Sequence, residues 1–283
     1  MIAITGATGN IGSQVASLLL QTGAHLRLLA RTPARLAPEL TEATPAPEVA
    51  RAHYTDDDAT RAALAGVDVF LMVSATESLD RVAEHRAFIN AAAAAGVEHV
   101  VYTSFVRAAP DAIFTHARDH WHTEEALKAS GMRWTILRDS FYLDFFAELI
   151  ASGEIRGPGG DGRCAGVARI DVARSAAAIL ADPGPHAGAT YDLTGPQLLT
   201  LAQMADIGGE VLGRAIPYID ETLDEAYASR RPYGAPDWEV EAWVSTYTAI
   251  AAGQLDVLTG DVERLTGRAP LSLAQVVGEQ SRG

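Results

Sequence analysis

The chain begins with a short apolar run that leads directly into three glycines, each separated from the next by two residues. The run covers residues 2–4, and the glycines are Gly6, Gly9 and Gly12. Glycine permits the positive φ of a tight turn, lets backbone approach a pyrophosphate, and allows close packing of a helix on a strand. The stretch 10–21 that follows has the pattern of an amphipathic helix, whose N-terminal amides and dipole favour phosphate. These features together predict a dinucleotide-binding unit.

The context of the glycines supports this prediction, because their spacing is G-x-x-G-x-x-G and not the commoner G-x-G-x-x-G. A second apolar run, 25–30, follows the helix and completes a strand-helix-strand unit of about 30 residues. The alternative is an ordinary strand-turn-helix corner without a ligand. We expect a bound dinucleotide to contact the three glycines and the residues beside them, Thr8, Asn10 and Ile11.

Apolar runs alternate with alanine- and leucine-rich stretches as far as about residue 138, which is typical of a parallel sheet covered on both faces. Further strands are expected at 49–53, 67–73, 98–103, 132–137 and 190–194. Further helices are expected at 58–65, 79–95, 115–130, 141–152 and 170–181. The predicted fold class is α/β, a Rossmann-type doubly wound sheet with helices on both faces and a smaller, mainly helical C-terminal domain that binds substrate.

The domain boundary is placed at a glycine-rich stretch, 153–162, which interrupts the alternation and is read as a loop. Residues 1–152 are assigned to the nucleotide-binding domain, to which 168–195 return. Residues 153–167 and 196–283 are assigned to the substrate-binding region. Aromatic residues of this region are candidates for a substrate cleft or, equally, for its core and rim: Tyr227, Tyr233, Trp238, Trp243 and Tyr247.

The composition narrows the classes of partner. Twenty-two basic and 36 acidic residues give a net charge of −14, and no basic cluster stands out, so direct binding to nucleic acid is not expected. The single cysteine, Cys164, excludes an internal disulfide and suits a reducing compartment. No apolar run reaches the ~18 residues of a membrane span, and no secretory leader precedes the first strand. We therefore expect a cytoplasmic protein that acts on a small molecule. A homodimer is compatible with the sequence.

The residue after the second strand indicates which dinucleotide is bound. An acidic residue about 20 positions past the glycines binds the ribose of NAD, whereas an arginine there accommodates the 2′-phosphate of NADP. Here that place holds Arg31, and no Asp or Glu occurs before Glu39. A guanidinium can bind a phosphate with two hydrogen bonds. We predict NADP(H) as the cofactor; the alternative is a solvated surface arginine.

The usual chemistry of short-chain dehydrogenases is excluded by the lysine content. Those enzymes protonate a carbonyl with a tyrosine whose phenol is acidified by a lysine four residues later. The only lysine of this chain is Lys128, and the residue four before it is Glu124. Any proton must therefore come from another group, and the fold alone does not define the reaction.

Further site residues are expected beyond the carboxyl ends of the strands, where ligands of open α/β sheets bind. The candidate contacts with the cofactor are Ser74, Ala75, Thr76, Thr103, Ser104, Ser140 and Phe141. His120, Tyr142 and Ser104 are the predicted catalytic residues, because histidine suits proton transfer near neutral pH and the two hydroxyls can orient an acceptor. The alternative is that each is structural. His116 and His120 lack a third ligand at suitable spacing, so no metal is predicted.

Several motifs together resemble the NmrA-like branch of the atypical short-chain dehydrogenase/reductases, and within it the NADPH-dependent quinone oxidoreductases. The matching segments are 4–12, 31–35, 96–97 before 102–104, 120–124, 137–138 before 141–142, 160–162, 170–173 and 191–195. The resemblance implies a Rossmann domain, a small C-terminal domain, a substrate cleft between them, and NADP(H) on the glycine loop and Arg31. His120 stands where isoflavone-type reductases carry lysine, and Phe145 and His53 also depart from the family pattern.

The resemblance and the missing tyrosine-lysine pair favour one activity. We expect hydride transfer from NADPH to a quinone-like or conjugated aromatic acceptor, with His120 and Tyr142 orienting it and Ser104 near the carboxamide or an acceptor oxygen. Two alternatives stay open. One is a non-enzymatic NADP(H)-binding redox sensor that acts through a protein partner, and the other is a tailoring enzyme for an aromatic natural product.

Overall fold

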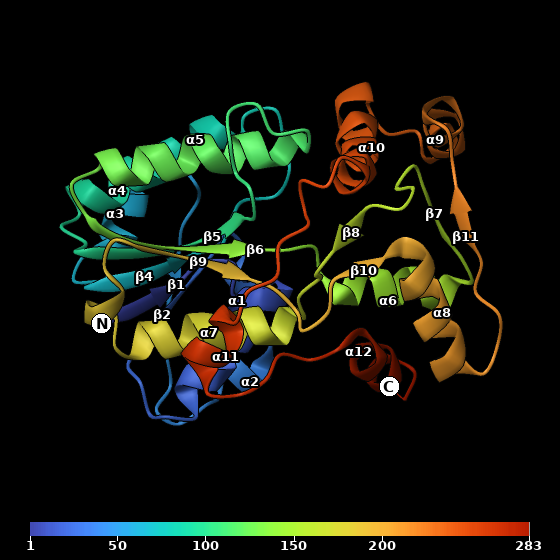
Figure 1. Ribbon diagram of the computed structural model, residues 1–283. Helices are drawn as coiled ribbons and strands as arrows, with labels where there is room; N and C mark the ends of the chain where they lie inside the picture. Colours follow the sequence, from blue (N-terminus) through green and yellow to red (C-terminus); the bar gives the residue numbers. More distant parts are fainter. Residues whose placement is uncertain (283) are drawn as a thin grey trace. The chain divides into compact units, whose positions relative to one another are not determined.

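A seven-stranded sheet forms the centre of the fold in the computed structural model, which describes residues 1–282 (Figure 1). The strand order is β3-β2-β1-β4-β5-β6-β9. The strands are β1 (Ile2–Ile4), β2 (Leu26–Ala30), β3 (Glu48–Arg51), β4 (Val69–Met72), β5 (His99–Phe105), β6 (Arg133–Asp139) and β9 (Ala189–Leu193). β1 pairs in parallel with β2 and with β4, so the strand order reverses beside β1. This is the topology of a Rossmann fold, and it confirms the predicted class.

Helices cover both faces of this sheet. They are α1 (Asn10–Leu20), α2 (Pro38–Thr41), α3 (Asp58–Leu64), α4 (Arg81–Ala94), α5 (Thr115–Ala129) and α7 (Arg169–Ala181), with single 3₁₀ turns at Pro33–Arg35 and Gly184–His186. Figure 1 shows α3, α4 and α5 on one face, with α1 and α7 on the other. Strands covered in this way are apolar on successive residues, and all four residues of β4 are buried.

The chain divides into two compact units. The first holds residues 1–104, 119–138 and 170–191, and the second holds 105–118, 139–169 and 192–283. The second unit contains α6 (Leu143–Ser152), α8 (Leu201–Leu212), α9 (Leu223–Arg230), α10 (Asp237–Ala251), α11 (Asp261–Thr266), α12 (Leu273–Gln280) and a 3₁₀ turn at Arg231–Tyr233. It also contains two short strand pairs, formed by β7 (Ile155–Gly157) with β11 (Tyr218–Asp220) and by β8 (Arg163–Cys164) with β10 (Leu199–Thr200).

The glycine-rich stretch 153–162 is more ordered than the sequence suggested. It contains β7, which pairs in parallel with β11. Two of its glycines pack against α10: a Cβ added at Gly157 would lie 2.4 Å from the Tyr247 ring, and one at Gly162 would lie 2.1 Å from the carbonyl oxygen of Ile250. Reading this stretch simply as a loop was wrong, because these glycines serve close packing as well as turns.

The helix expected from residue 141 begins at Leu143. Tyr142 remains extended and forms a parallel bridge with Val167, and the Leu143 amide donates to the Val167 carbonyl oxygen. These backbone bonds hold residues 141–142 outside the helix. The side chains that follow β6 are therefore carried on extended backbone.

The aromatic residues of the C-terminal region have different environments. Tyr247 is buried, whereas Tyr233 is 74% exposed and meets the edge of Trp243.

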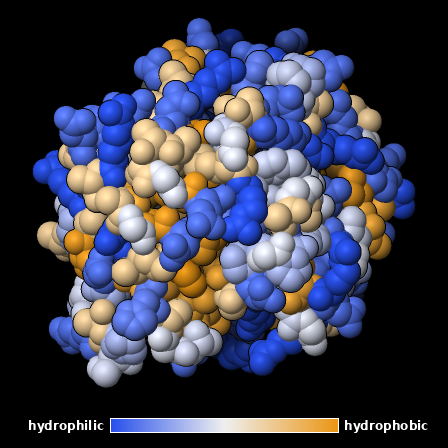
Figure 2. Space-filling model, turned by 90° about the vertical axis from the view of Figure 1, so that its left-hand side faces the viewer, coloured by the Kyte–Doolittle hydropathy of each residue, from blue (hydrophilic) through white to orange (hydrophobic). Residues whose placement is uncertain are grey.

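The surface on the left-hand side of Figure 1, shown in Figure 2, has apolar residues interrupted by hydrophilic ones. None of the helices within residues 1–282 has the length and apolar character needed to cross a membrane.

The turn between β1 and α1 supplies the first testable prediction. A Cβ on Gly12 would lie only 2.4 Å from the carbonyl oxygen of Gly6, whereas a Cβ on Gly9 would lie 3.4 Å from it. Gly12→Ala must push backbone away from backbone, so we expect the free energy of unfolding to fall by about 1–3 kcal/mol. Chemical denaturation checks this value. Gly9→Ala is the matched control and should unfold nearly as the parent does; equal losses in the two variants would contradict the packing role of Gly12.

Candidate functional site

The glycine turn has the form that a dinucleotide requires. Gly6 adopts φ +64°, and the Gly9 amide donates to its carbonyl oxygen over 2.8 Å. Thr8, Gly9 and Asn10 are exposed at the start of α1, where the first amides of any helix lack partners within it. A phosphate can therefore reach the turn. The absence of a side chain at Gly12 lets α1 approach the turn closely, whereas a Cβ at Gly6 would lie 3.0 Å from that of Val73. The residues present fit a pyrophosphate group.

Tyr54, which no sequence motif predicted, is hydrogen-bonded to residues beside this turn. Its hydroxyl is hydrogen-bonded to the Thr5 hydroxyl and donates to the carbonyl oxygen of Val73. Its ring stacks on Phe88 with 4.6 Å between centroids. Burial raises the pKa of Tyr54, so the phenol stays protonated and remains a hydrogen-bond donor. Tyr54 thus joins the ends of β1 and β4 beside the glycine turn.

Arg31 follows β2 directly and is exposed. Arg35, also exposed, ends the 3₁₀ turn that Pro33 begins. The structure therefore leaves the Arg31 guanidinium available to a ligand at the end of the strand next to β1.

The segment after β4 is held by two side chains of α4. The Ala75 amide donates to Nε2 of His85 over 2.8 Å. The Ala75 carbonyl oxygen accepts from Nε of Arg81 over 3.0 Å. The preceding amide, that of Ser74, donates to the hydroxyl of Thr103 over 2.9 Å. Three predicted cofactor contacts, Ser74, Ala75 and Thr103, are therefore brought together, while Thr76 lies exposed beside them.

The hydrogen bonds of His85 fix its protonation state. The Thr123 hydroxyl donates to the carbonyl oxygen of Asp119, so it accepts the hydrogen bond from Nδ1 of His85, 2.8 Å away. Nε2 of His85 must then be the unprotonated nitrogen that accepts from Ala75. Burial, with a smaller contribution from the Arg81 charge, lowers the pKa of His85 to about 3. His85 is thus a neutral residue that positions the Ser74–Ala75 segment.

His120 lies in the same buried network. Its Nδ1 is 2.8 Å from the hydroxyl of Tyr102, and its Nε2 is 3.4 Å from Nη2 of Arg81. Because a guanidinium can only donate, Nε2 accepts and Nδ1 carries the hydrogen that is donated to Tyr102. His120 is therefore linked through Arg81 to the segment that holds Ala75. Its predicted catalytic role stays a prediction.

Ser104 lies within β5, because that strand runs to Phe105 and not to Thr103 as expected. Its hydroxyl donates to Oε1 of Glu124 over 2.7 Å, which leaves only its lone pairs for another donor. Glu124 is fully buried and receives two hydrogen bonds from Arg138, of 2.8 and 2.7 Å. Lys128 lies 3.6 Å from the same carboxylate and 2.9 Å from Glu125. The only lysine is thus part of a salt-bridge group on α5.

Ser140, Phe141 and Tyr142 follow β6 in the second unit. The Ser140 amide donates to the carbonyl oxygen of Leu193. The Phe141 ring lies edge-on to Phe105, with 4.9 Å between centroids. Ser140 is buried, whereas Phe141 and Tyr142 are half-buried.

Tyr142 donates from its hydroxyl to Oδ2 of Asp139 over 3.0 Å, and the guanidinium of Arg169 lies 5.3 Å from its ring centroid. Asp139 is only 2% exposed, and burial raises the pKa of its carboxyl group to about 8. The sequence places residues 138–142 after a strand, where the nicotinamide end of the cofactor is expected, but assigns Asp139 no role of its own.

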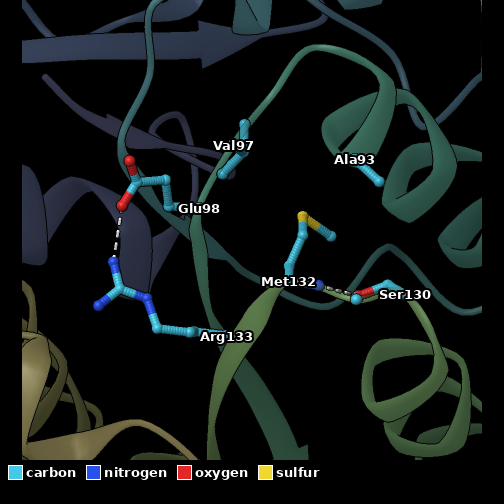
Figure 3. A pocket seen from close by; sticks show the side chains of 7 residues that line it. Ala93, Val97, Glu98, Ser130, Met132 and Arg133 are labelled. Atoms are coloured by element: carbon cyan, nitrogen blue, oxygen red, sulfur yellow. Dashed lines mark hydrogen bonds and ion pairs between the residues drawn. The ribbon is translucent and has the colours of Figure 1, made fainter.

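A pocket of about 440 Å³ lies at the amino ends of β5 and β6 (Figure 3). Its lining residues are Ala93, Val97, Glu98, Ser130, Gly131, Met132 and Arg133. Glu98 precedes β5 and Arg133 begins β6, and their side chains form a salt bridge of 2.7 Å. Ligands of open α/β sheets bind at the carboxyl ends, so this pocket is not the nucleotide site. The described residues, 1–282, contain no group of three His, Cys, Asp or Glu suited to a metal ion.

Comparison with known proteins agrees with the glycine turn and the strand order. Residues 6–183 match the family described as NAD(P)H-binding. Quinone oxidoreductase 2 of Escherichia coli is 33% identical over 283 residues, covering 98% of this chain and 97% of the relative. NAD(P)H azoreductase of Xenophilus azovorans is 30% identical over 279 residues, covering 97% of this chain and 96% of the relative.

Solved structures of NADPH-binding proteins are similar to this chain over nearly its whole length. The structure of the NADPH-dependent quinone oxidoreductase of Escherichia coli complexed with NADPH has a TM-score of 0.90 and 31% identity, and covers 99% of this chain and 100% of that one. NmrA, a negative transcriptional regulator, has a TM-score of 0.77 at 17% identity over 98% of this chain and 94% of its own, which shows a shared fold. The chain belongs to the NAD(P)H-binding family and is an NAD(P)H-dependent oxidoreductase. The predicted family and cofactor class are confirmed.

The two bonds on Ala75 lead to the second prediction. His85→Leu removes the acceptor of the Ala75 amide, so we expect the affinity for NADPH to fall about tenfold, equivalent to ~1.4 kcal/mol. His85→Gln, which keeps an acceptor and a donor, should restore most of the affinity. Fluorescence titration with NADPH measures this, and because His85 is neutral the affinity should not titrate through His85 between about pH 5 and 8.

His99→Leu is the matched control for this experiment. His99 is also buried in the first unit, at the amino end of β5, and its Nε2 is 2.8 Å from the Thr135 hydroxyl. Its loss should lower the melting temperature without changing the affinity for NADPH. If both leucine variants lost stability but neither lost affinity, His85 would be a structural residue only.

Proposed function

We propose that this chain uses NADPH to reduce a quinone-like or other conjugated aromatic acceptor. The observation that carries the proposal is the combination of a dinucleotide cradle with the absence of a tyrosine-lysine acid. The only lysine, Lys128, is engaged by Glu124 and Glu125. An electron-poor ring accepts hydride without a strong acid, and this makes such an acceptor a good match. The names of the quinone oxidoreductase and azoreductase relatives support the same class.

The bound nucleotide would supply the hydride, and the protein would bind and orient the two reactants. The proposed binding groups for the pyrophosphate are the backbone of Gly6 to Gly12 and the first amides of α1. Arg31 would bind the 2′-phosphate, since the exposed guanidinium is free of acidic neighbours in the sequence as far as Glu39. The segment Ser74–Thr76 would contact the ribose.

His120, Tyr142 and Ser104 are the residues proposed to orient the acceptor and its oxygen. His120 and Ser104 are each fixed by a short hydrogen bond, of 2.8 Å to Tyr102 and 2.7 Å to Glu124. Side chains fixed in this way cost little further ordering when a ligand binds, which favours positioning as the main contribution of the protein. Thr103 is bound by the Ser74 amide, and Ser140 and Phe141 stay proposed cofactor contacts.

The cofactor preference can be tested at Arg31. Arg31→Ser removes a charge-assisted bond to the 2′-phosphate, so the affinity for NADPH should fall on the order of tenfold or more while that for NADH changes little. Dissociation constants for both nucleotides measure the effect. Arg86→Ser is the matched control, because Arg86 is also exposed but lies on α4. An unchanged preference for NADPH in Arg31→Ser would refute the assignment.

The activity itself is tested by NADPH oxidation against a panel of quinones, azo dyes and simple ketones. We expect turnover of the quinones or conjugated aromatics and none of the ketones, because only the former need no strong protein acid. The change in NADPH absorbance reports the rate. Tight binding of NADPH and NADP⁺ without turnover of any acceptor would instead favour the redox sensor, and the proposal would fail.

A further inference from the structure

Asp139 is the last residue of β6 and is one of the most buried acidic groups of the second unit. Its Oδ2 is bound by the Tyr142 hydroxyl at 3.0 Å, and its Oδ1 has no hydrogen-bond partner in the described part of the chain. Its main-chain oxygen accepts from the Val106 amide, so the strand end itself is firmly held. The carboxyl group therefore has one polar neighbour in an otherwise closed environment.

A single partner does not suit an ionised carboxylate. The ionised group can accept about four hydrogen bonds, and burying it without them is costly. A neutral carboxylic acid has a lower requirement, because it can donate its one hydrogen and leave the second oxygen as a carbonyl. Burial raises the pKa of Asp139 to about 8, in agreement with this geometry.

The charged groups around this pair are engaged elsewhere. Arg169 lies over the Tyr142 ring, while its amide donates to Asp144 and its guanidinium reaches Glu148, both on α6. Arg138, the preceding residue of β6, directs its guanidinium to Glu124. On β9 the titratable residues are Tyr191, whose hydroxyl is 2.7 Å from Nδ1 of His186, and Asp192, whose amide donates to Asp261. No salt bridge to Asp139 is formed within residues 1–282, so no cation stabilises its ionised form there.

Keeping Asp139 neutral destabilises the fold. The carboxyl pKa is raised from 3.8 to about 8, so above the lower value the unfolded chain releases a proton that the folded chain retains. The folded state loses stability progressively as the pH rises between these values. A buried acid with this cost, hydrogen-bonded to a half-buried tyrosine, is typical of a functional site.

The 3.0 Å contact in which the Tyr142 hydroxyl donates to an ionised Asp139 can run in the opposite direction when the carboxyl group carries its own proton. We propose that Asp139 is a neutral carboxylic acid that donates this hydrogen bond to the Tyr142 oxygen and thereby directs the Tyr142 hydrogen toward the acceptor. This inference rests on the proposed function. Reduction of a quinone to a hydroquinone adds one hydride and one proton, and the proton is the part that these side chains supply. Tyr142 is the proposed proton donor, and Asp139 acts through it.

The O–H bond of Tyr142 breaks as an O–H bond forms on the acceptor, and the Asp139 proton moves to the Tyr142 oxygen. After the product leaves, a proton from solvent returns to Asp139 through the half-buried Tyr142 hydroxyl. The guanidinium of Arg169, 5.3 Å from the ring centroid, stabilises negative charge that develops on the phenol oxygen. A carboxylic acid and a tyrosine thus replace the tyrosine-lysine pair that this chain lacks.

The protonation state is tested without nucleotide or acceptor. Infrared difference spectra between the parent and Asp139→Asn should show a carboxylic acid carbonyl band that disappears as the pH rises through about 8. Asp171→Asn is the matched control, because Asp171 is equally buried but forms a salt bridge of 2.9 Å with Arg174, and this substitution should leave the Asp139 band in place. Asp139→Asn should also raise the melting temperature near pH 8 and leave it unchanged near pH 4. Absence of the band at neutral pH would overturn the inference.

The role in proton transfer is tested by the pH profile of the reductase. We expect kcat of the parent to fall as the pH rises above about 8, and Asp139→Asn to lose this dependence while its affinity for NADPH is kept. Tyr142→Phe should lower kcat on the order of 10²-fold. A parent-like pH profile in Asp139→Asn would overturn the relay. If no quinone is reduced while the infrared band is present, the proposed acceptor is wrong and the neutral carboxyl group is retained.

Discussion

The contact on which the nucleotide-binding unit depends is the approach of α1 to the backbone of the turn before it. Gly12 packs against the carbonyl oxygen of Gly6, in a space that a single methyl group would overfill. This contact sets the direction of α1 and so the direction in which its first amides point. Because β1 lies where the strand order reverses, the same contact places the helix at the point of the sheet where ligands of this fold bind.

Other parts of the first unit are arranged around this point by buried polar side chains. Tyr54 connects the ends of β1 and β4, His85 and Arg81 hold Ala75, and Glu124 binds both Ser104 and Arg138. Each of these groups is paired, so their burial does not leave isolated charges. The strands supply the apolar core, and the polar side chains determine where the segments after them lie.

The fold was largely predictable from the sequence, because strand and helix periodicity and the glycine spacing are local signals. The nucleotide turn followed from the same signals. The polar network was not predictable, since Ala75 and His85, Tyr102 and His120, or Ser104 and Glu124 meet only after the sheet is assembled. Arg81 and His85 are four residues apart and therefore lie on one face of α4, which is the one local sign of their shared role. The composition predicted that the strand ends before Ser104. Hydrogen bonding with the neighbouring strands extends β5 to Phe105, and Ser104 therefore lies within it.

The two hydrogen bonds that His85 and Arg81 form with Ala75 have a consequence for how related proteins can diverge. Both bonds come from one helix, so a small rotation or shift of α4 must carry the Ser74–Ala75 segment with it. Phe88, further along the same helix, packs against Tyr54 and Phe70 and so helps to set the position of α4. Substitutions at such core positions can therefore move the proposed cofactor-binding segment from a distance. In the proposed function, the range of acceptors would then change through repacking of the core, with every proposed ligand contact left unchanged.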